Sequence, residues 1–462
     1  MSHHQAAGYQ TYYQRTTPVE RLTETSLQFL HIQAVGGLVL VAAAVLAVVW
    51  ANSRWADTYQ ELLHAHFSVA FGRLHLEMGL QHAINDGLMT VFFFLVGMEI
   101  KREVLVGELR DRKTALLPAF AALGGMVVPA AIYLAFQSGK PAANGWGIPM
   151  ATDIAFAIGL LALLGGRIPS GLKVFLLALA IADDLGAVLV IAVFYTEQIS
   201  FLPLALAGVG FLGVTVMQRV GVRPIPPYVV AGLLIWLAMY HSGIHPTVAG
   251  VLLGLLTPMA SWLPYPQVVG KVRFWSRELD VSIADPPDRE RRWQALRSLA
   301  EVQQDAMSPL ARLETGLHLW VAYVIVPVFA LANAGVAFSL GSSGDSQTAS
   351  VTLAVAGALL IGKPVGIFLF SLLAVKSGLA RLPARVGWVH VLGAGMLGGI
   401  GFTVSLFIAA LSFDDPATLD AAKTGVLAGS TAAAILGLGV LWLVSRRQPS
   451  PLATDHARVG DH

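Results

Sequence analysis

Long apolar runs are the feature that most constrains this chain. Twelve stretches of mostly apolar residues each approach the roughly 20 residues that an α-helix needs to cross a bilayer. Only 13% of the residues are charged, about half the share typical of soluble domains. The sequence therefore predicts an all-α polytopic membrane protein with about 12 transmembrane helices. They are 33–51, 80–100, 115–137, 148–165, 171–196, 201–218, 226–240, 246–263, 317–338, 351–375, 388–412 and 422–445.

The distribution of Lys and Arg supports this count. If the N-terminus is cytoplasmic, 25 of the 30 Lys and Arg residues fall in the inner segments, 4 in the outer segments, and Lys363 within a span. Such a bias is typical of inner loops. It predicts two cytoplasmic termini, a cytoplasmic segment 1–32, a transmembrane domain 33–445 and a disordered tail 446–462.

Two connections are long. Alternating residues within 52–79 predict a β-hairpin on the outer side, which could pair two protomers of a homodimer by strand addition. The stretch 264–315 is charged and Pro-rich, and it predicts a cytoplasmic loop with a surface helix that begins at Asp288. Net charge is +2 and Cys is absent, so we expect no nucleic-acid partner and no thiolate or Cys-based metal chemistry.

Charged residues inside the spans each need a reason, because a charge at mid-membrane costs about 2.5–3.5 kcal/mol. Asp183 and Asp184 lie among apolar residues, where adjacent carboxylates repel each other and lose hydration. Such a pair holds a proton or binds a cation, depending on pH. Asp153 could instead cap a helix at a break. Asp86 and Glu99 could be solvated helix ends.

Lys363 is the only basic residue in the interior of a span, between a Gly and a Pro. It could form a structural ion pair with one of the aspartates. It could also be an ammonium group that competes with sodium or a proton for the same carboxylate. These two interpretations are compatible.

Two spans look interrupted, at 145–157 and 393–403, where Gly and Pro are dense. Unwound backbone at membrane depth is tolerated only where it lines a cavity or is buried in protein. These are the fourth and eleventh spans, each in the middle of a trio, and paired interrupted helices in inverted repeats indicate an ion or substrate site. The glycines could also simply allow close helix packing.

Six motifs occur in a fixed order along the spans. They begin at Ala151 (ATDIAFA), Ala178 (ALAIADDLGA), Ser242 (SGIHPTVAG), Phe329 (FALANAG), Gly362 (GKP) and Gly398 (GGIGFT). This ordered set resembles the bacterial sodium/proton antiporter family NhaA. The resemblance implies inverted repeats of spans 3–5 and 10–12, with two discontinuous helices that cross at mid-membrane. It also implies electrogenic, pH-regulated exchange of Na⁺ or Li⁺ for protons across the bacterial inner membrane, without enzymatic activity or a cofactor.

The resemblance assigns roles to individual residues. Asp183 and Asp184 would carry the transport site, with Asp184 as the core sodium ligand and Asp183 paired with Lys363. Thr152 and Asp153 would lie at the crossing, where Asp153 compensates the facing helix dipoles.

A second group would respond to pH. The resemblance places five of these residues near a cytoplasmic funnel and links His245 to the pH profile; the five are Asp86, Glu99, Arg102, Glu103 and Glu314. Thr315 stands where a His is expected and Leu319 where a Pro is expected. These departures leave the pH response of this segment open.

Three other classes of protein remain as alternatives. A sodium-coupled symporter of an organic anion on the same type of fold would need a roomy polar pocket, in which Lys363 could bind the anion. An intramembrane aspartyl protease would need two facing carboxylates from separate helices. A passive channel would not need a buried ion pair.

Overall fold

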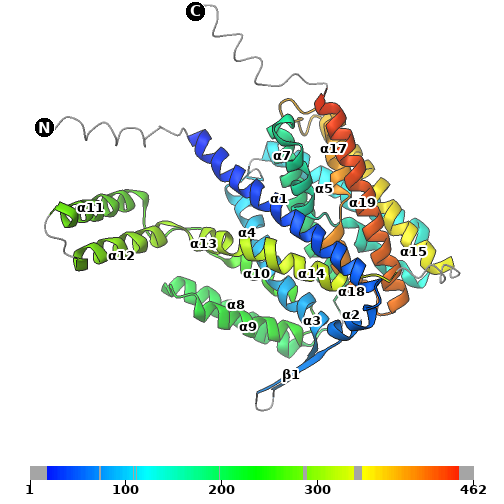
Figure 1. The fold of residues 1–462 in the computed structure, drawn as a ribbon, viewed down its shortest axis with the longest axis horizontal. Helices are drawn as coiled ribbons and strands as arrows, with labels where there is room; N and C mark the ends of the chain where they lie inside the picture. Colours follow the sequence, from blue (N-terminus) through cyan, green and yellow to red (C-terminus); the bar gives the residue numbers. More distant parts are fainter. Residues whose placement is uncertain are drawn as a thin grey trace, which may run out of the picture.

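The described part of the chain is almost entirely helical. The computed structural model describes residues 18–71, 74–107, 109–110, 112–196, 198–284, 289–337 and 346–446. Figure 1 shows the start of α1 and the end of α19 near one end of the helical bundle, and the strand β1 near the opposite end.

The first half of the chain, to residue 256, contains most of the bundle and the one hairpin of the described residues. Its elements are α1 (Pro18–Ala51), α2 (Ala56–Leu63), β1 (His66–Phe71), β2 (Leu74–Gly79), α3 (Leu80–Ala83), the π-helical turn Ile84–Leu88, α4 (Met89–Leu105), α5 (Arg112–Gln137), the 3₁₀ segment Pro141–Met150, α6 (Ile154–Leu163), the 3₁₀ turn Gly165–Arg167, α7 (Ser170–Phe194), α8 (Phe201–Val220), α9 (Pro226–Tyr240) and α10 (Thr247–Leu256).

The second half adds a helical pair outside the bundle and then completes the bundle. Its elements are α11 (Tyr265–Ala284), α12 (Arg289–Ala306), α13 (Pro309–Trp320), the π-helical turn Val321–Ile325, α14 (Val326–Asn333), α15 (Ser346–Gly357), the π-helical turn Ala358–Gly362, α16 (Lys363–Lys376), α17 (Trp388–Gly398), α18 (Phe402–Ser412) and α19 (Pro416–Arg446).

The helices match the apolar stretches of the sequence. Among the described residues, seven continuous helices are long and apolar enough to cross a membrane, or up to ten spans if each of three bent helix pairs is one span. The remaining two apolar stretches form the shorter helices α9 and α10. The protein is therefore an all-helical, multi-pass membrane protein apart from its hairpin.

Several predicted boundaries differ from the ends of the helices, and two of these differences have a local explanation. The stretch 246–263 is helical only to Leu256, because Pro258 disfavours helical backbone in the residue before it. The predicted span 317–338 begins instead at Pro309. Ser308 caps this helix, since its side-chain oxygen accepts a hydrogen bond of 3.2 Å from the backbone N–H of Ala311.

The two predicted interruptions are confirmed. The segment Pro141–Met150 meets α6 at an angle of 44°, and α17 meets α18 at 46°. The two breaks contact each other, because the backbone N–H of Asp153 donates to the carbonyl of Ile400 over 2.7 Å. The hydroxyl of Ser405 also donates to the carbonyl of Ile148 over 2.6 Å. Hydrogen bonds thus join the two broken segments directly.

Close packing of α5 and α16 positions Lys363 at the start of α16. A side chain at Gly124 would collide with the carbonyl of Gly366, and one at Gly366 would collide with the carbonyl of Gly124. Glycine at both positions lets the two backbones approach each other. The aliphatic part of Lys363 lies over Gly125 on the same face of α5.

Both long connections have regular structure. Strands β1 and β2 pair antiparallel from His66↔Gly79 to Phe71↔Leu74, so the predicted hairpin is confirmed. The predicted surface helix is α12, but it is only half of a helical pair with α11, which projects away from the bundle (Figure 1). The two ends of the pair lie next to each other, since the backbone N–H of Leu263 donates to the carbonyl of Asp305 over 3.1 Å.

Candidate functional site

Asp183 is held in a buried ion pair. Its Oδ2 lies 2.5 Å from Nζ of Lys363, and both side chains are 1% exposed. The ammonium group also donates to the carbonyl of Met150, at the end of the 3₁₀ segment. The expected pairing of Asp183 with Lys363 is therefore present, and it connects α7 to α16 and to one broken segment.

Asp184 points away from Asp183 and into a cavity. Consecutive residues of a helix point about 100° apart, and Asp184 lines a cavity of about 50 Å³ that Asp183 does not line. Its Oδ1 is buried without a hydrogen-bond partner in the described part of the chain. A cavity of this size holds a few waters or a small ion. Asp184 is thus a buried carboxylate with room for a cation beside it.

Asp153 joins the two broken segments within the same cavity. It caps α6, because its Oδ1 accepts from the backbone N–H of Phe156 over 3.0 Å. Its Oδ2 accepts from the backbone N–H and the hydroxyl of Thr403, in the first turn of α18, over 3.2 and 2.6 Å. One carboxylate therefore compensates the positive ends of two helices, so the capping interpretation and the dipole interpretation describe the same contact.

Thr152 adds a further oxygen to the cavity. Its hydroxyl donates to the carbonyl of Gly398 over 2.8 Å, so its lone pairs remain available as acceptors. Together with Asp153, Asp184 and Thr403, it gives the cavity a wall of carboxylate and hydroxyl oxygens. Hard cations prefer ligands of this kind.

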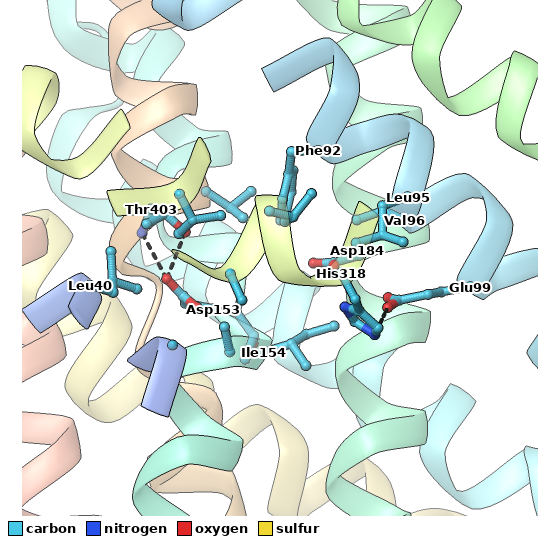
Figure 2. Close-up of a pocket in the computed structure, with 17 residues that line it drawn as sticks. Leu40, Phe92, Leu95, Val96, Glu99, Asp153, Ile154, Asp184, His318 and Thr403 are labelled. Atoms are coloured by element: carbon cyan, nitrogen blue, oxygen red, sulfur yellow. Dashed lines mark hydrogen bonds and ion pairs between the residues drawn. The ribbon is translucent and has the colours of Figure 1, made fainter. Parts of the chain in front are cut away.

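Glu99 and His318 line the end of the cavity away from Asp153 and Thr403, on the side of Asp184, as Figure 2 shows. Oε1 of Glu99 lies 3.4 Å from Nε2 of His318. Next to them, Arg102 lies 2.5 Å from a carboxylate oxygen of Glu314 and 3.8 Å from one of Glu103. Four of the five expected funnel residues are thus brought together.

Asp86 does not belong to this group, and its expected placement there was wrong. It lies sixteen residues before Arg102, which corresponds to about 24 Å of helix. Its two carboxylate oxygens face His82 at 3.0 Å and His245 at 3.6 Å. The side chain of His245 is 11% exposed and its ring packs edge-to-face on Phe407.

The two departures from the family pattern lie away from the cavity. Thr315 is exposed and donates its hydroxyl to the carbonyl of Ala311 over 2.8 Å. Leu319 is 49% exposed. On the buried face of the same helix, His318 reaches the cavity instead.

Sequence reasoning gave no role to His318 or Thr403. His318 follows Glu314 by four residues, a spacing that places both side chains on one helix face. Thr403 is the second residue of the helix after the GGIGF break, where a backbone N–H must find an acceptor. These were the available signals.

Each π-helical turn adjoins a polar residue described above. One contains Asp86, one ends immediately before Lys363, and one begins three residues after His318. Single π-helical turns are frequent at functional sites, because they change the direction in which the neighbouring side chains point.

A bundle of membrane helices with buried carboxylates around a narrow cavity defines a transporter of small cations. The chain belongs to the family described as Na+/H+ antiporter 1, whose model matches residues 27–441. This is a family of transporters rather than enzymes.

Curated relatives are similar in sequence to this chain over most of their length. The chain is 48% identical to "Na(+)/H(+) antiporter NhaA" of Rhodopirellula baltica over 427 residues, which cover 92% of this chain and 95% of the relative. It is 46% identical to "Na(+)/H(+) antiporter NhaA 2" of Sorangium cellulosum, with 93% and 92% covered. The solved structure of the sodium proton antiporter MjNhaP1 from Methanocaldococcus jannaschii is 12% identical, with a TM-score of 0.49 and 92% and 99% covered.

Proposed function

We propose that this protein extrudes Na⁺ or Li⁺ in exchange for protons, with Asp184 as the principal ion ligand. The observation that carries the proposal is the contrast between two adjacent carboxylates. Asp183 is paired with Lys363, whereas Asp184 faces the cavity. Oδ1 of each carboxylate is buried without a hydrogen-bond partner in the described part of the chain. Desolvation makes such a carboxylate favour either a proton or a metal ion.

Competition for this carboxylate gives the exchange. On an alkaline inner side the site loses protons and takes a sodium ion. After the site opens to a more acidic outer side, protons displace the ion and the protonated site returns. If more than one proton returns per ion, net charge moves, and exchange is electrogenic. Lys363 and Asp153 are further groups near the site that could contribute to the number of protons exchanged and to regulation by pH.

The cavity argues against the organic-anion symporter. Pockets for organic ligands have volumes of about 300–1,000 Å³, whereas this cavity measures about 50 Å³. The aspartyl protease is also disfavoured, because Asp183 is engaged by Lys363 and does not face Asp184 across a substrate cleft.

The membrane arrangement extends this proposal. All twelve apolar stretches cross the inner membrane of a bacterium, both termini are cytoplasmic, and spans 3–5 and 10–12 are inverted repeats with their broken members crossing near mid-membrane. Two protomers pair through the outer hairpin. Glu99, Arg102, Glu103 and Glu314 respond to pH on the cytoplasmic side, whereas Asp86 and His245 do so on the outer side.

Proton movement in proteoliposomes tests the proposal. A fluorescent ΔpH probe is read as Na⁺, Li⁺, K⁺ or choline is added between pH 6.5 and 9. We expect dequenching by Na⁺ and Li⁺ alone, and none in Asp184→Asn. The control is Asp280→Asn, an exposed acid on α11. Equal activity in Asp184→Asn and wild type would contradict the proposal.

A further inference from the structure

We propose that Glu99, Glu314 and His318 form a binding site for Zn²⁺ at the end of the cavity opposite Asp153. One donor atom from each of these side chains lies within 4.8 Å of the other two. Figure 2 shows Glu99 and His318 side by side there, with the ring of His318 turned toward the carboxylate. The Zn²⁺ ion would remain bound at this site and would not be transported.

Two helices bring the three donors together. Glu314 and His318 are four residues apart on α13 and share one helix face. Glu99 approaches from α4, and its Oε1 lies 3.4 Å from Nε2 of His318. The three side chains are only 7–12% exposed, so a bound ion would be largely shielded from water.

The charge of the surroundings matches a divalent cation. When ionised, Glu99, Glu103 and Glu314 carry three negative charges, and Arg102 supplies one positive charge against them. These four side chains thus carry −2, where isolated charges are costly to bury, and Asp184 adds a further carboxylate in the same cavity. One Zn²⁺ ion would neutralise the charge of −2, whereas one Na⁺ ion would not.

The donor types select the metal. Imidazole together with carboxylates suits Zn²⁺ and Co²⁺, while Mg²⁺ and Ca²⁺ prefer sites made only of oxygen. Three protein ligands leave the fourth tetrahedral position to water, as in open zinc sites. Arg102 contacts one oxygen of Glu314 and is 34% exposed, so it can move aside for the metal.

A metal at this position would block the cavity between Glu99 and Asp184, which both line it. This second step rests on the proposed antiport, since it requires ions to pass Glu99. We therefore expect Zn²⁺ to inhibit exchange, whereas equal concentrations of Mg²⁺ or Ca²⁺ do not.

Binding is tested directly with Co²⁺, whose d–d absorption reports tetrahedral coordination. The full chain is purified with an affinity tag that lacks histidine. We expect one Co²⁺ per chain with a visible band that Zn²⁺ abolishes. His318→Gln and Glu99→Gln should each weaken Co²⁺ binding by at least about tenfold, and the exposed-histidine control His64→Gln should not. Size-exclusion profiles establish that each variant is folded.

Several results would overturn the site. These are absence of the band in wild type, an unchanged band in both folded variants, or an equal loss in His64→Gln. Because the band is read without transport, it decides the binding claim even if antiport fails.

Inhibition is tested separately in proteoliposomes. The Zn²⁺ concentration for half inhibition, measured against each variant's own metal-free rate, should rise at least about tenfold in His318→Gln. The same concentration in wild type and this variant would overturn the blocking step.

Discussion

Asp183 and Asp184 are neighbours in sequence but occupy different chemical environments. Asp183 is bound to the ammonium group of Lys363, and Asp184 lines the cavity. A helix separates adjacent side chains by about 100°, so one turn of α7 can serve two functions. The carboxylate of Asp183 helps to hold α7 against α16, and that of Asp184 remains available to an ion.

The ion pair predicts a specific pattern of stability. Lys363→Met should destabilise the folded protein by about 3–5 kcal/mol, because it leaves the carboxylate of Asp183 buried without its partner. The double variant Lys363→Met/Asp183→Asn should recover much of this loss. Thermal unfolding in detergent measures both. A single variant that melts like wild type would contradict the importance of the pair.

Thr403 should matter through its hydroxyl. Thr403→Val removes the 2.6 Å hydrogen bond to Asp153, and bonds of this kind to a charged group contribute about 1.5–3 kcal/mol. We expect the antiport rate to fall about tenfold or more, and Thr403→Ser to retain most of it. If Val and Ser behave alike, the hydroxyl is not the cause.

The approach of α5 and α16 can be tested with one methyl group. Gly366→Ala places a Cβ against the carbonyl of Gly124, and such overpacking costs about 1–3 kcal/mol. Gly357→Ala is the matched control, because nothing lies within 4 Å of its Cβ. The melting temperature should fall for Gly366→Ala and stay level or rise for Gly357→Ala.

The α11–α12 pair should be dispensable for exchange. It contributes no residue to the cavity, and Leu263 and Asp305 close its base. Replacing residues 266–303 with a short Gly-Ser linker should therefore leave the Na⁺-driven rate unchanged, since ends that lie close together tolerate such deletion. Loss of exchange in a folded deletion variant would assign this pair a role in transport.

The hairpin should control assembly. Deleting residues 67–78 and joining His66 to Gly79, which are paired in the sheet, removes the strand edges that could add to a second protomer. Light scattering in detergent should show a dimer for wild type and a monomer for the deletion. A monomeric wild type, or a dimeric deletion, would reject pairing through this hairpin.

Periodicity and composition predicted the helices well, because apolar length and Gly/Pro density are local properties. The breaks near Asp153 and Ile400 were foreseen for this reason. The pairing of Asp183 with Lys363 came from the family resemblance, because residues 180 positions apart leave no local pattern.

Other features depend on packing that no local pattern encodes. The family resemblance placed Asp86 with Arg102, but the continuous helix Leu80–Leu105 carries them toward opposite ends. His318 was passed over because its meaning depends on Glu99, which belongs to another helix. The α11 helix was missed although its sequence offered a local signal, since apolar residues recur at helical spacing at Val268, Val272, Trp275 and Leu279.

The carboxylate of Asp153 also has a mechanical consequence. It accepts hydrogen bonds from the first turns of both α6 and α18, so separating the two broken segments would leave helix ends without their shared acceptor. We expect these segments to move together as one rigid block. Alternating exposure of the ion would then occur by sliding at the outer surfaces of that block, rather than by bending within it.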